Sequence, residues 1–304
     1  MIRLIKAGLI RYLKSPFTVI ALSCSLIFGV IHGAVEWRNI HLDYEFYYNK
    51  SLWMSSPMSD IWFKCSVWVM IVLISLEVGK EFSDGTIRNK LYIGHTRMWI
   101  YLSEILSSSV AAFFNYLVFM IPTVIGGGCF FGTMSPIACL SLLAELLLFF
   151  IVWGIFSAVL TMLIADRAVG VVSVFAAMLL LAVINVGLRS YYYNTAPAQI
   201  TETTIELSED EKPYTVERRV ENPWYVEGLP KVLVNIEHET DPFSRSYNAC
   251  NYAYIHFPER AKAEDLDMQA QIDRQVRYDC IVLVVIIGIL TAAGLAVFKR
   301  KDLK

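Results

Sequence analysis

Charged residues are scarce in this chain. Only 18% of its 304 residues are charged and 56% are hydrophobic, whereas soluble domains carry about a quarter charged residues. The mean hydropathy is correspondingly positive, at +0.50. This balance argues against a soluble globular protein and indicates a membrane protein.

Common catalytic and metal-binding motifs are also missing. The only Gly-Lys pair, Gly79-Lys80, lacks the rest of a P-loop, and no second histidine follows His238-Glu239 on a helical turn. There is no GxSxG motif, no CxxC and no Cys/His cluster. We therefore expect a non-enzyme that binds no cofactor or metal of its own. A Cys250–Cys280 disulfide stays an open alternative.

Long apolar runs are what the chain has in abundance. Each reaches, alone or with its flanks, the ~18–20 residues that cross a bilayer as a helix. The runs predict a mainly α-helical, polytopic membrane protein with about six spans: 17–35, 62–76, 100–125, 137–164, 168–188 and 280–298.

Basic residues fix the expected orientation. With the N-terminus inside, the cytoplasmic segments hold thirteen lysines and arginines, whereas the first outer loop, 36–60, holds only Arg38 and Lys50. Both termini are therefore expected in the cytoplasm. The protein itself is expected in the plasma membrane of a bacterium. The inner set is Arg3, Lys6, Arg11, Lys14, Lys80, Arg88, Lys90, Arg97, Arg167, Lys299, Arg300, Lys301 and Lys304.

The first fifteen residues have the pattern of an amphipathic helix. Four apolar residues fall on one side, and Arg3, Arg11 and Lys14 fall on the other. This pattern predicts a helix lying along the inner membrane surface. The alternative is a cytoplasmic extension of the first span, against which Pro16 predicts a break. The apolar set is Ile2, Ile5, Leu9 and Leu13.

The chain divides into a transmembrane domain at 1–188, an extracellular domain at 189–278, and a last span with a basic tail at 279–304. ITETTIEL and YTVERRVE, separated by SEDEKP, predict a hairpin, with KVLVNIE as a further strand. The segment after Pro258 predicts a helix that runs into the last span. A small α+β domain is expected. Its acidity fits either a cationic ligand or a solvated exterior.

Polar residues inside the predicted spans are few. Glu145 is either a substrate-pathway or proton-linked acid, or a carboxyl neutralised between helices. Asn115 and Asn185 are weaker candidates, because an intramembrane amide most often bonds a neighbouring helix. Gly126–Gly128, after Pro122, predicts either a broken or re-entrant hairpin or a simple loop.

The polar segment EFSDGTIRNKLYIGHTR joins the second and third spans. Asp84-Gly85 predicts a turn, Thr86 an N-cap, and Gly94 a helix end. Ile87 and Leu91 fall at i and i+4, with Arg88 off their face. Such a short amphipathic helix suits docking into a cytoplasmic partner. The simpler alternative is that the basic residues of this segment only set the orientation of the two neighbouring spans in the membrane.

Here the chain resembles a family. GTIRNKL, then TR and SEIL, are similar to the cytoplasmic loop of type-2 ABC transporter permeases. The N-terminal helix, the number of spans and the basic tail fit the same layout. Glu104 departs from the pattern, since a lysine commonly stands there. The residues that match are Glu77, Glu81, Gly85, Thr86, Thr96 and Arg97.

The resemblance implies a permease subunit of an exporter whose two ATPase subunits, with their ATP and Mg, are separate chains. A second permease chain, identical or related, would complete the transporter in membrane lipid, with no nucleic acid involved. Residues 84–97 would hold the coupling helix. The implied cargo is an amphipathic or hydrophobic compound, such as a peptide antibiotic, a lantibiotic or a lipid-like molecule. The alternatives are a membrane sensor or assembly protein that binds a ligand outside, and an ion-driven secondary transporter.

Overall fold

The computed structural model describes residues 2–41, 61–128, 136–195, 199–207, 213–221 and 261–301. Over these ranges the chain is almost entirely helical, as predicted. The helices are α1 (Ile2–Lys14), α2 (Pro16–His41), α4 (Ile61–Ser83), α5 (Thr86–Tyr92), α6 (Arg97–Gly128), α7 (Pro136–Ile164), α8 (Arg167–Thr195) and α11 (Ala261–Arg300). Two strands, β1 (Gln199–Leu207) and β2 (Pro213–Glu221), complete the described structure.

Five helices are long and apolar enough to cross a membrane, so the chain has the character of a multi-pass membrane protein. Their apolar stretches are Pro16–Val35, Trp62–Ser83, Arg97–Ile125, Leu143–Ile164 and Val276–Arg300. The sixth predicted span falls in α8, where the apolar stretch that the structure describes, Arg167–Leu181, is shorter. The sixth span therefore stays a prediction.

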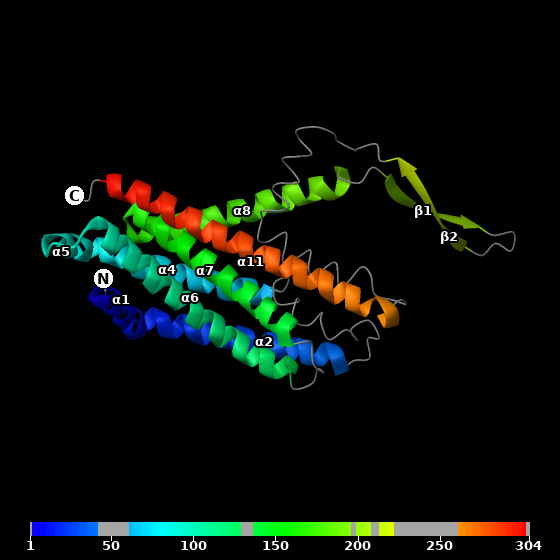
Figure 1. Cartoon of the computed structure of the whole chain (residues 1–304), viewed down its shortest axis with the longest axis horizontal. Helices are drawn as coiled ribbons and strands as arrows, with labels where there is room; N and C mark the ends of the chain where they lie inside the picture. Colours follow the sequence, from blue (N-terminus) through cyan, green and yellow to red (C-terminus); the bar gives the residue numbers. More distant parts are fainter. Residues whose placement is uncertain are drawn as a thin grey trace. The chain divides into compact units, whose positions relative to one another are not determined.

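The spanning helices pack side by side in one unit, Met1–Leu179 with Ser246–Lys304. Helix α2 packs against α4 and α6, while α7 packs against α4, α6 and α11 (Figure 1). Near the start of α4, the buried ring of Phe63 contacts the rings of Phe119, Phe149 and Phe150, with centroids 5.4–5.7 Å apart. Interlocking aromatic packing stabilises this contact between α4, α6 and α7.

The ends of the chain and the short helix α5 share one end of this bundle. Figure 1 shows α5 beside the start of α1 and the end of α11. On which side of a membrane this end of the bundle lies stays a prediction.

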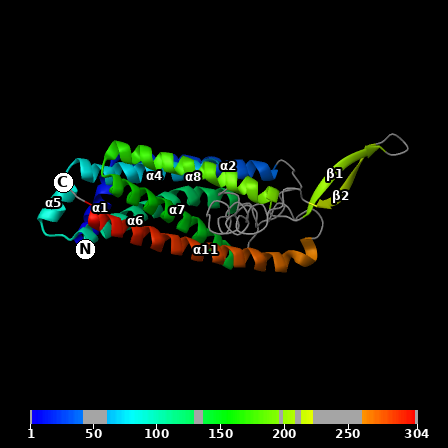
Figure 2. The same cartoon turned by 90° about the horizontal axis from the view of Figure 1, so that it is seen from above.

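Helix α1 ends where the sequence predicts. Ser15 separates it from α2, and Pro16 is the first residue of α2, a position where proline's missing N–H costs nothing. The Ser15 hydroxyl accepts a hydrogen bond from the Phe17 N–H, 3.3 Å away, and so caps α2. Figure 2 shows α1 turned across the long axes of the neighbouring helices, as a helix on a membrane surface would be.

Helix α6 is longer than predicted at its far end. It continues through Pro122 to Gly128 without a break, so within the described residues the predicted broken hairpin does not begin at Gly126–Gly128. One turn after Phe119, the Thr123 hydroxyl donates a hydrogen bond to the Phe119 carbonyl at 2.9 Å, next to the proline. What connects α6 to α7, residues 129–135, lies outside the described residues.

A second unit, Leu180–Arg245, contains the predicted hairpin. Strands β1 and β2 pair antiparallel, with Glu202 opposite Arg218 and Ile200 opposite Val220. The hairpin prediction is therefore confirmed, and so is the helix that runs into the last span, since α11 is continuous over 40 residues. The predicted strand KVLVNIE and Cys250 lie outside the described residues.

Candidate functional site: the α5 end of the bundle

Helix α5 is held between two glycines in the left-handed backbone region. Gly85, at φ 68°, is its N-cap, and Gly94 has φ 94°. The N–H of Gly94 bonds to the Leu91 carbonyl at 2.9 Å and that of His95 to the Lys90 carbonyl at 3.1 Å, a Schellman ending. The predicted helix end at Gly94 is confirmed. The predicted N-cap at Thr86 is wrong: Thr86 is the first helical residue, because the left-handed turn that glycine permits places the cap one residue earlier.

The apolar side of α5 faces the protein. Ile87 is 2% exposed, and Leu91 is half-buried. The i, i+4 pair predicted as a docking face therefore mainly anchors α5 to its own bundle. The large apolar side chains that project outward are Tyr92, 84% exposed, and Ile93, 77% exposed, with Arg88 exposed beside them.

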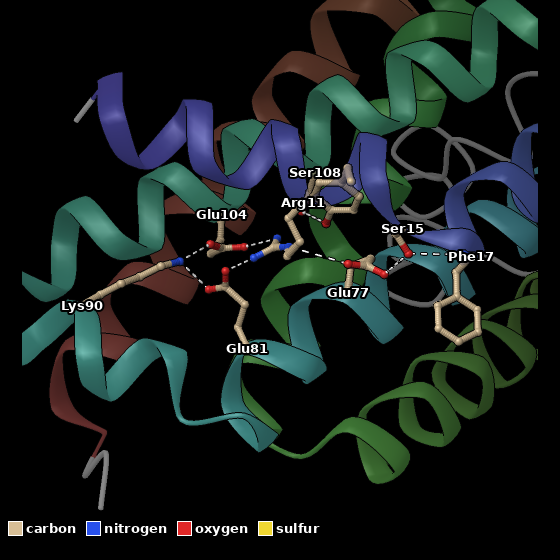
Figure 3. Close-up of polar contacts among 9 residues, drawn as sticks. Arg11, Ser15, Phe17, Glu77, Glu81, Lys90, Glu104 and Ser108 are labelled. Atoms are coloured by element: carbon tan, nitrogen blue, oxygen red, sulfur yellow. Dashed lines mark hydrogen bonds and ion pairs between the residues drawn. The ribbon is translucent and has the colours of Figure 1, made fainter.

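A cluster of five charged side chains lies beneath α5. We call it the charge cluster; its members are Arg11, Glu77, Glu81, Lys90 and Glu104. They come from α1, α4, α5 and α6, so four helices meet in it (Figure 3). The three carboxylates are almost completely buried, and their side chains are 1–7% exposed. Such burial is sustainable only because each carboxylate has a cationic partner.

Glu104 is the centre of the cluster. Its carboxylate accepts from Arg11 Nη2 at 2.8 Å and from Lys90 Nζ at 3.0 Å. Glu81 is shared by the same two cations: it pairs with Arg11, and with Lys90 Nζ at 2.5 Å. Lys90 of α5 and Arg11 of α1 are thus linked through two common carboxylates, as Figure 3 shows. A displacement of α5 changes contacts that also hold α1.

Glu77 closes the cluster on the side of α2. Its carboxylate accepts a hydrogen bond from the Ser15 hydroxyl and lies 3.7 Å from Arg11 Nε. Next to it, the Tyr12 and Ser108 hydroxyls are 3.1 Å apart and bond α1 to α6. These contacts position the junction between α1 and α2 against α4 and α6.

The electrostatics of the two cations differ. Burial pulls the pKa of Arg11 down, but Glu104 and its neighbours outweigh burial and hold that pKa above its ordinary value. For Lys90 burial outweighs the attraction of Glu104, so the pKa of Lys90 is lowered. Burial also raises the pKa of Tyr12 to about 12, which keeps its hydroxyl neutral and able to donate. Arg11 is therefore the more firmly charged of the two anchors.

Thr96 and Arg97 serve the helix ends beside α5. The Thr96 hydroxyl accepts from the Trp99 N–H, 3.4 Å away, at the start of α6. Arg97 Nη1 donates to the carbonyls of Lys299 and Lys301, at 3.1 and 2.5 Å, at the end of α11. In turn Lys301 Nζ donates to carbonyls at the end of α7, among them that of Met162 at 3.2 Å. Cations at helix C-termini satisfy free carbonyls and oppose the negative end of the dipole.

The predicted site residues separate into two groups. The structure brings together the predicted coupling residues of α4, α5 and the start of α6 at one end of the bundle. Asn115 and Glu145 lie instead within the spans, both buried. Asn115 accepts from Ser25 at 3.2 Å and donates to the Ala111 carbonyl at 3.0 Å, which is the helix-bonding alternative. Asn185 belongs to α8, but its side chain lies outside the description.

Three members of the charge cluster are absent from the predicted site: Arg11, Lys90 and Glu104. The sequence pattern places Arg11 on the cationic side of α1, yet its side chain is only 17% exposed and turns into the bundle. The reason is that Gly8 and Tyr12 of α1 lie against Ser107 and Ser108 of α6, and Arg11 borders this face. The one signal in the sequence was Glu104 itself, a charge within an apolar run where the resemblance expects a lysine.

No metal centre competes with this interpretation in the described ranges, where no group of three or more His, Cys, Asp or Glu side chains has the arrangement to hold an ion. No protein-family model matches the chain, and no curated protein sequence matches it.

Proposed function

We propose that this chain is the permease subunit of an ATP-driven ABC exporter, and that α5 is its coupling helix. One observation carries the proposal: α5 is anchored inward by Ile87 and Lys90 while Tyr92 and Ile93 project from the end of the bundle. A short helix with exposed apolar side chains at its tip fits a groove on a partner protein. The local sequence resemblance to type-2 permeases supports the same function.

The anchoring of α5 suits the transmission of force. Helix α5 lies between α4 and α6, and Lys90 ties it to Glu81 of one and Glu104 of the other. A push on α5 would therefore be passed to both neighbouring spans. Arg11, which shares both carboxylates, would extend the response to α1.

The rest of the transporter follows from this function. Two cytoplasmic ATPase subunits bind ATP and Mg and seat one coupling helix each, and a second permease chain completes the pathway. The α5 end of the bundle, with both termini, faces the cytoplasm of a bacterium. Residues 189–278 then lie outside the plasma membrane. The cargo is an amphipathic or hydrophobic compound, such as a peptide antibiotic, lantibiotic or lipid-like molecule.

An affinity pull-down from detergent-solubilised native membranes tests the proposal. We expect a P-loop ATPase to co-purify with the tagged full-length chain and to be lost with the Tyr92→Asp, Ile93→Asp double variant. Both side chains are largely exposed, so the substitutions should leave the bundle folded. The matched control is Tyr92→Phe, Ile93→Val, which keeps the apolar tip and should retain the ATPase.

The other outcomes are equally informative. If both variants retain the ATPase, the chain is still a permease but α5 is not the docking element. If no ATPase co-purifies with the native chain, the exporter function is wrong and a membrane sensor becomes the better proposal. Substitution of Ile87, by contrast, tests folding and not docking, since its side chain is buried.

A further inference from the structure

The outward surface of α1 combines cations with apolar side chains. Arg3, Lys6 and Lys14 are exposed, and between them lie Ile10, 40% exposed, and Leu13, 67% exposed. Their spacing places them along one side of the 13-residue helix. The helix contains no acidic residue at all, so this surface carries charge of one sign.

The opposite side of α1 is fixed to the bundle. Leu4 and Tyr12 are buried, and Gly8 lies so close to Ser107 of α6 that a Cβ there would clash with the serine hydroxyl. Arg11 reaches the charge cluster from the same side. The helix therefore cannot turn its cations inward, and Arg3, Lys6 and Lys14 remain directed away from the protein.

We infer that the exposed side of α1 binds anionic phospholipid headgroups. The apolar pair enters the edge of the acyl region, while the three cations contact phosphates around it, as amphipathic basic helices do at anionic membranes. Charge complementarity selects anionic lipid over zwitterionic lipid. The inference rests on the membrane location of the chain and not on its proposed role as a permease.

Lipid binding on this side of α1 also stabilises the charge cluster. Arg11 leaves the same helix one residue after Ile10 and holds Glu81 and Glu104 together with Lys90 of α5. Anionic lipid that holds α1 in place therefore stabilises the arrangement around α5. Removal of the three exposed cations weakens lipid binding without touching any cluster contact.

Native mass spectrometry of the detergent-solubilised full chain provides the test, with phosphatidylglycerol and phosphatidylcholine titrated separately. The native chain should bind phosphatidylglycerol more tightly than phosphatidylcholine. The variant Arg3→Gln, Lys6→Gln, Lys14→Gln should weaken phosphatidylglycerol binding by about fivefold for each cation removed, since a basic residue near an anionic surface contributes ~1 kcal/mol. Phosphatidylcholine binding should hardly change.

Two variants make the result specific. A charge-matched control, Lys80→Gln, Lys299→Gln, Arg300→Gln, removes three exposed cations from other helices and should keep the preference. The variant Arg3→Lys, Lys6→Arg, Lys14→Arg retains the charge of α1 and should also keep it. The inference is overturned if the native chain shows no preference, if the α1 variant binds like the native chain, or if the control loses as much binding as the α1 variant.

Discussion

Two layers of the same bundle are joined by different chemistry. At the α5 end, α1, α4, α5 and α6 meet through five charged side chains, three of them almost completely buried carboxylates. Deeper in the spans, serine and asparagine side chains make neutral contacts between the helices. The Ser66 hydroxyl donates to Ser25 at 3.0 Å, and Ser25 donates to Asn115. Ser75 and Ser157 hydroxyls meet at 2.8 Å between α4 and α7.

The difference shows where buried ion pairs can be stable and where weaker neutral contacts are used instead. A buried ion pair tolerates no loss of a partner, because the remaining charge is left desolvated. Neutral hydroxyl and amide bonds inside a membrane contribute little each, since a separated helix finds other partners. At the α5 end, loss of one charged side chain should therefore weaken the contacts of all four helices. In the deeper layer, loss of one hydrogen bond should have only a small effect.

Removal of Glu104 should have the largest effect on stability. Glu104→Ala leaves Arg11 and Lys90 with one shared carboxylate, and we expect a loss of about 3–5 kcal/mol in the free energy of unfolding. Thermal unfolding of the purified chain, followed by size-exclusion chromatography, measures the change. A Lys90→Ala variant and the double variant complete a cycle. Additive losses would show that Lys90 and Glu104 do not interact energetically.

A packing substitution in the deeper layer should have the next largest effect. A Cβ at Gly29 of α2 would collide with the Phe119 carbonyl oxygen and lie 2.8 Å from Pro122 Cγ. Gly29→Val should therefore cost about 1–3 kcal/mol, as overpacking usually does. The same thermal assay measures it. Gly288→Val is the matched control, because nothing lies within 4 Å of a Cβ there, and a cost equal to that of Gly29→Val would refute the close contact.

Loss of a neutral polar contact should have the smallest effect. Asn115→Ala removes the acceptor of Ser25 and should destabilise the chain by about 0.6 kcal/mol, the usual size for such bonds between membrane helices. Ser25→Ala removes the donor of the same bond and also the acceptor of the Ser66 hydroxyl, so it should cost about twice as much. A cost near that of Glu104→Ala would mean that the two layers do not differ as proposed. Transport measurements on Asn115→Ala distinguish a role in the substrate pathway from a structural role, since loss of a pathway residue would reduce transport far more than stability.

Much of the fold could be predicted from the sequence. The apolar runs located the long helices, Pro16 located the break before α2, and two β-rich stretches located the hairpin. These features depend on local composition and spacing. The helix end at Gly94 was also predictable, because few residues other than glycine adopt a positive φ readily.

The candidate site was predictable only in part. Glu77 and Glu81 were identified by resemblance, yet their cationic partners Arg11 and Lys90 were not, since the partners are distant in sequence or lie on another helix. The inward side of α5 was misjudged for the same reason. An i, i+4 apolar pair such as Ile87 and Leu91 shows that a face will be covered, but not by what.

The sequence by itself determined that this chain is helical, where its long apolar segments lie and that a short polar helix joins two of them. Those properties follow from hydrophobicity and backbone preference, which act within one segment. Only the tertiary structure decided that Arg11 points inward, that Glu104 is shared by α1 and α5, and that Tyr92 and Ile93 are left exposed. These outcomes depend on which helices pack together, because the cost of burying a charge is offset only by a partner that packing brings within reach.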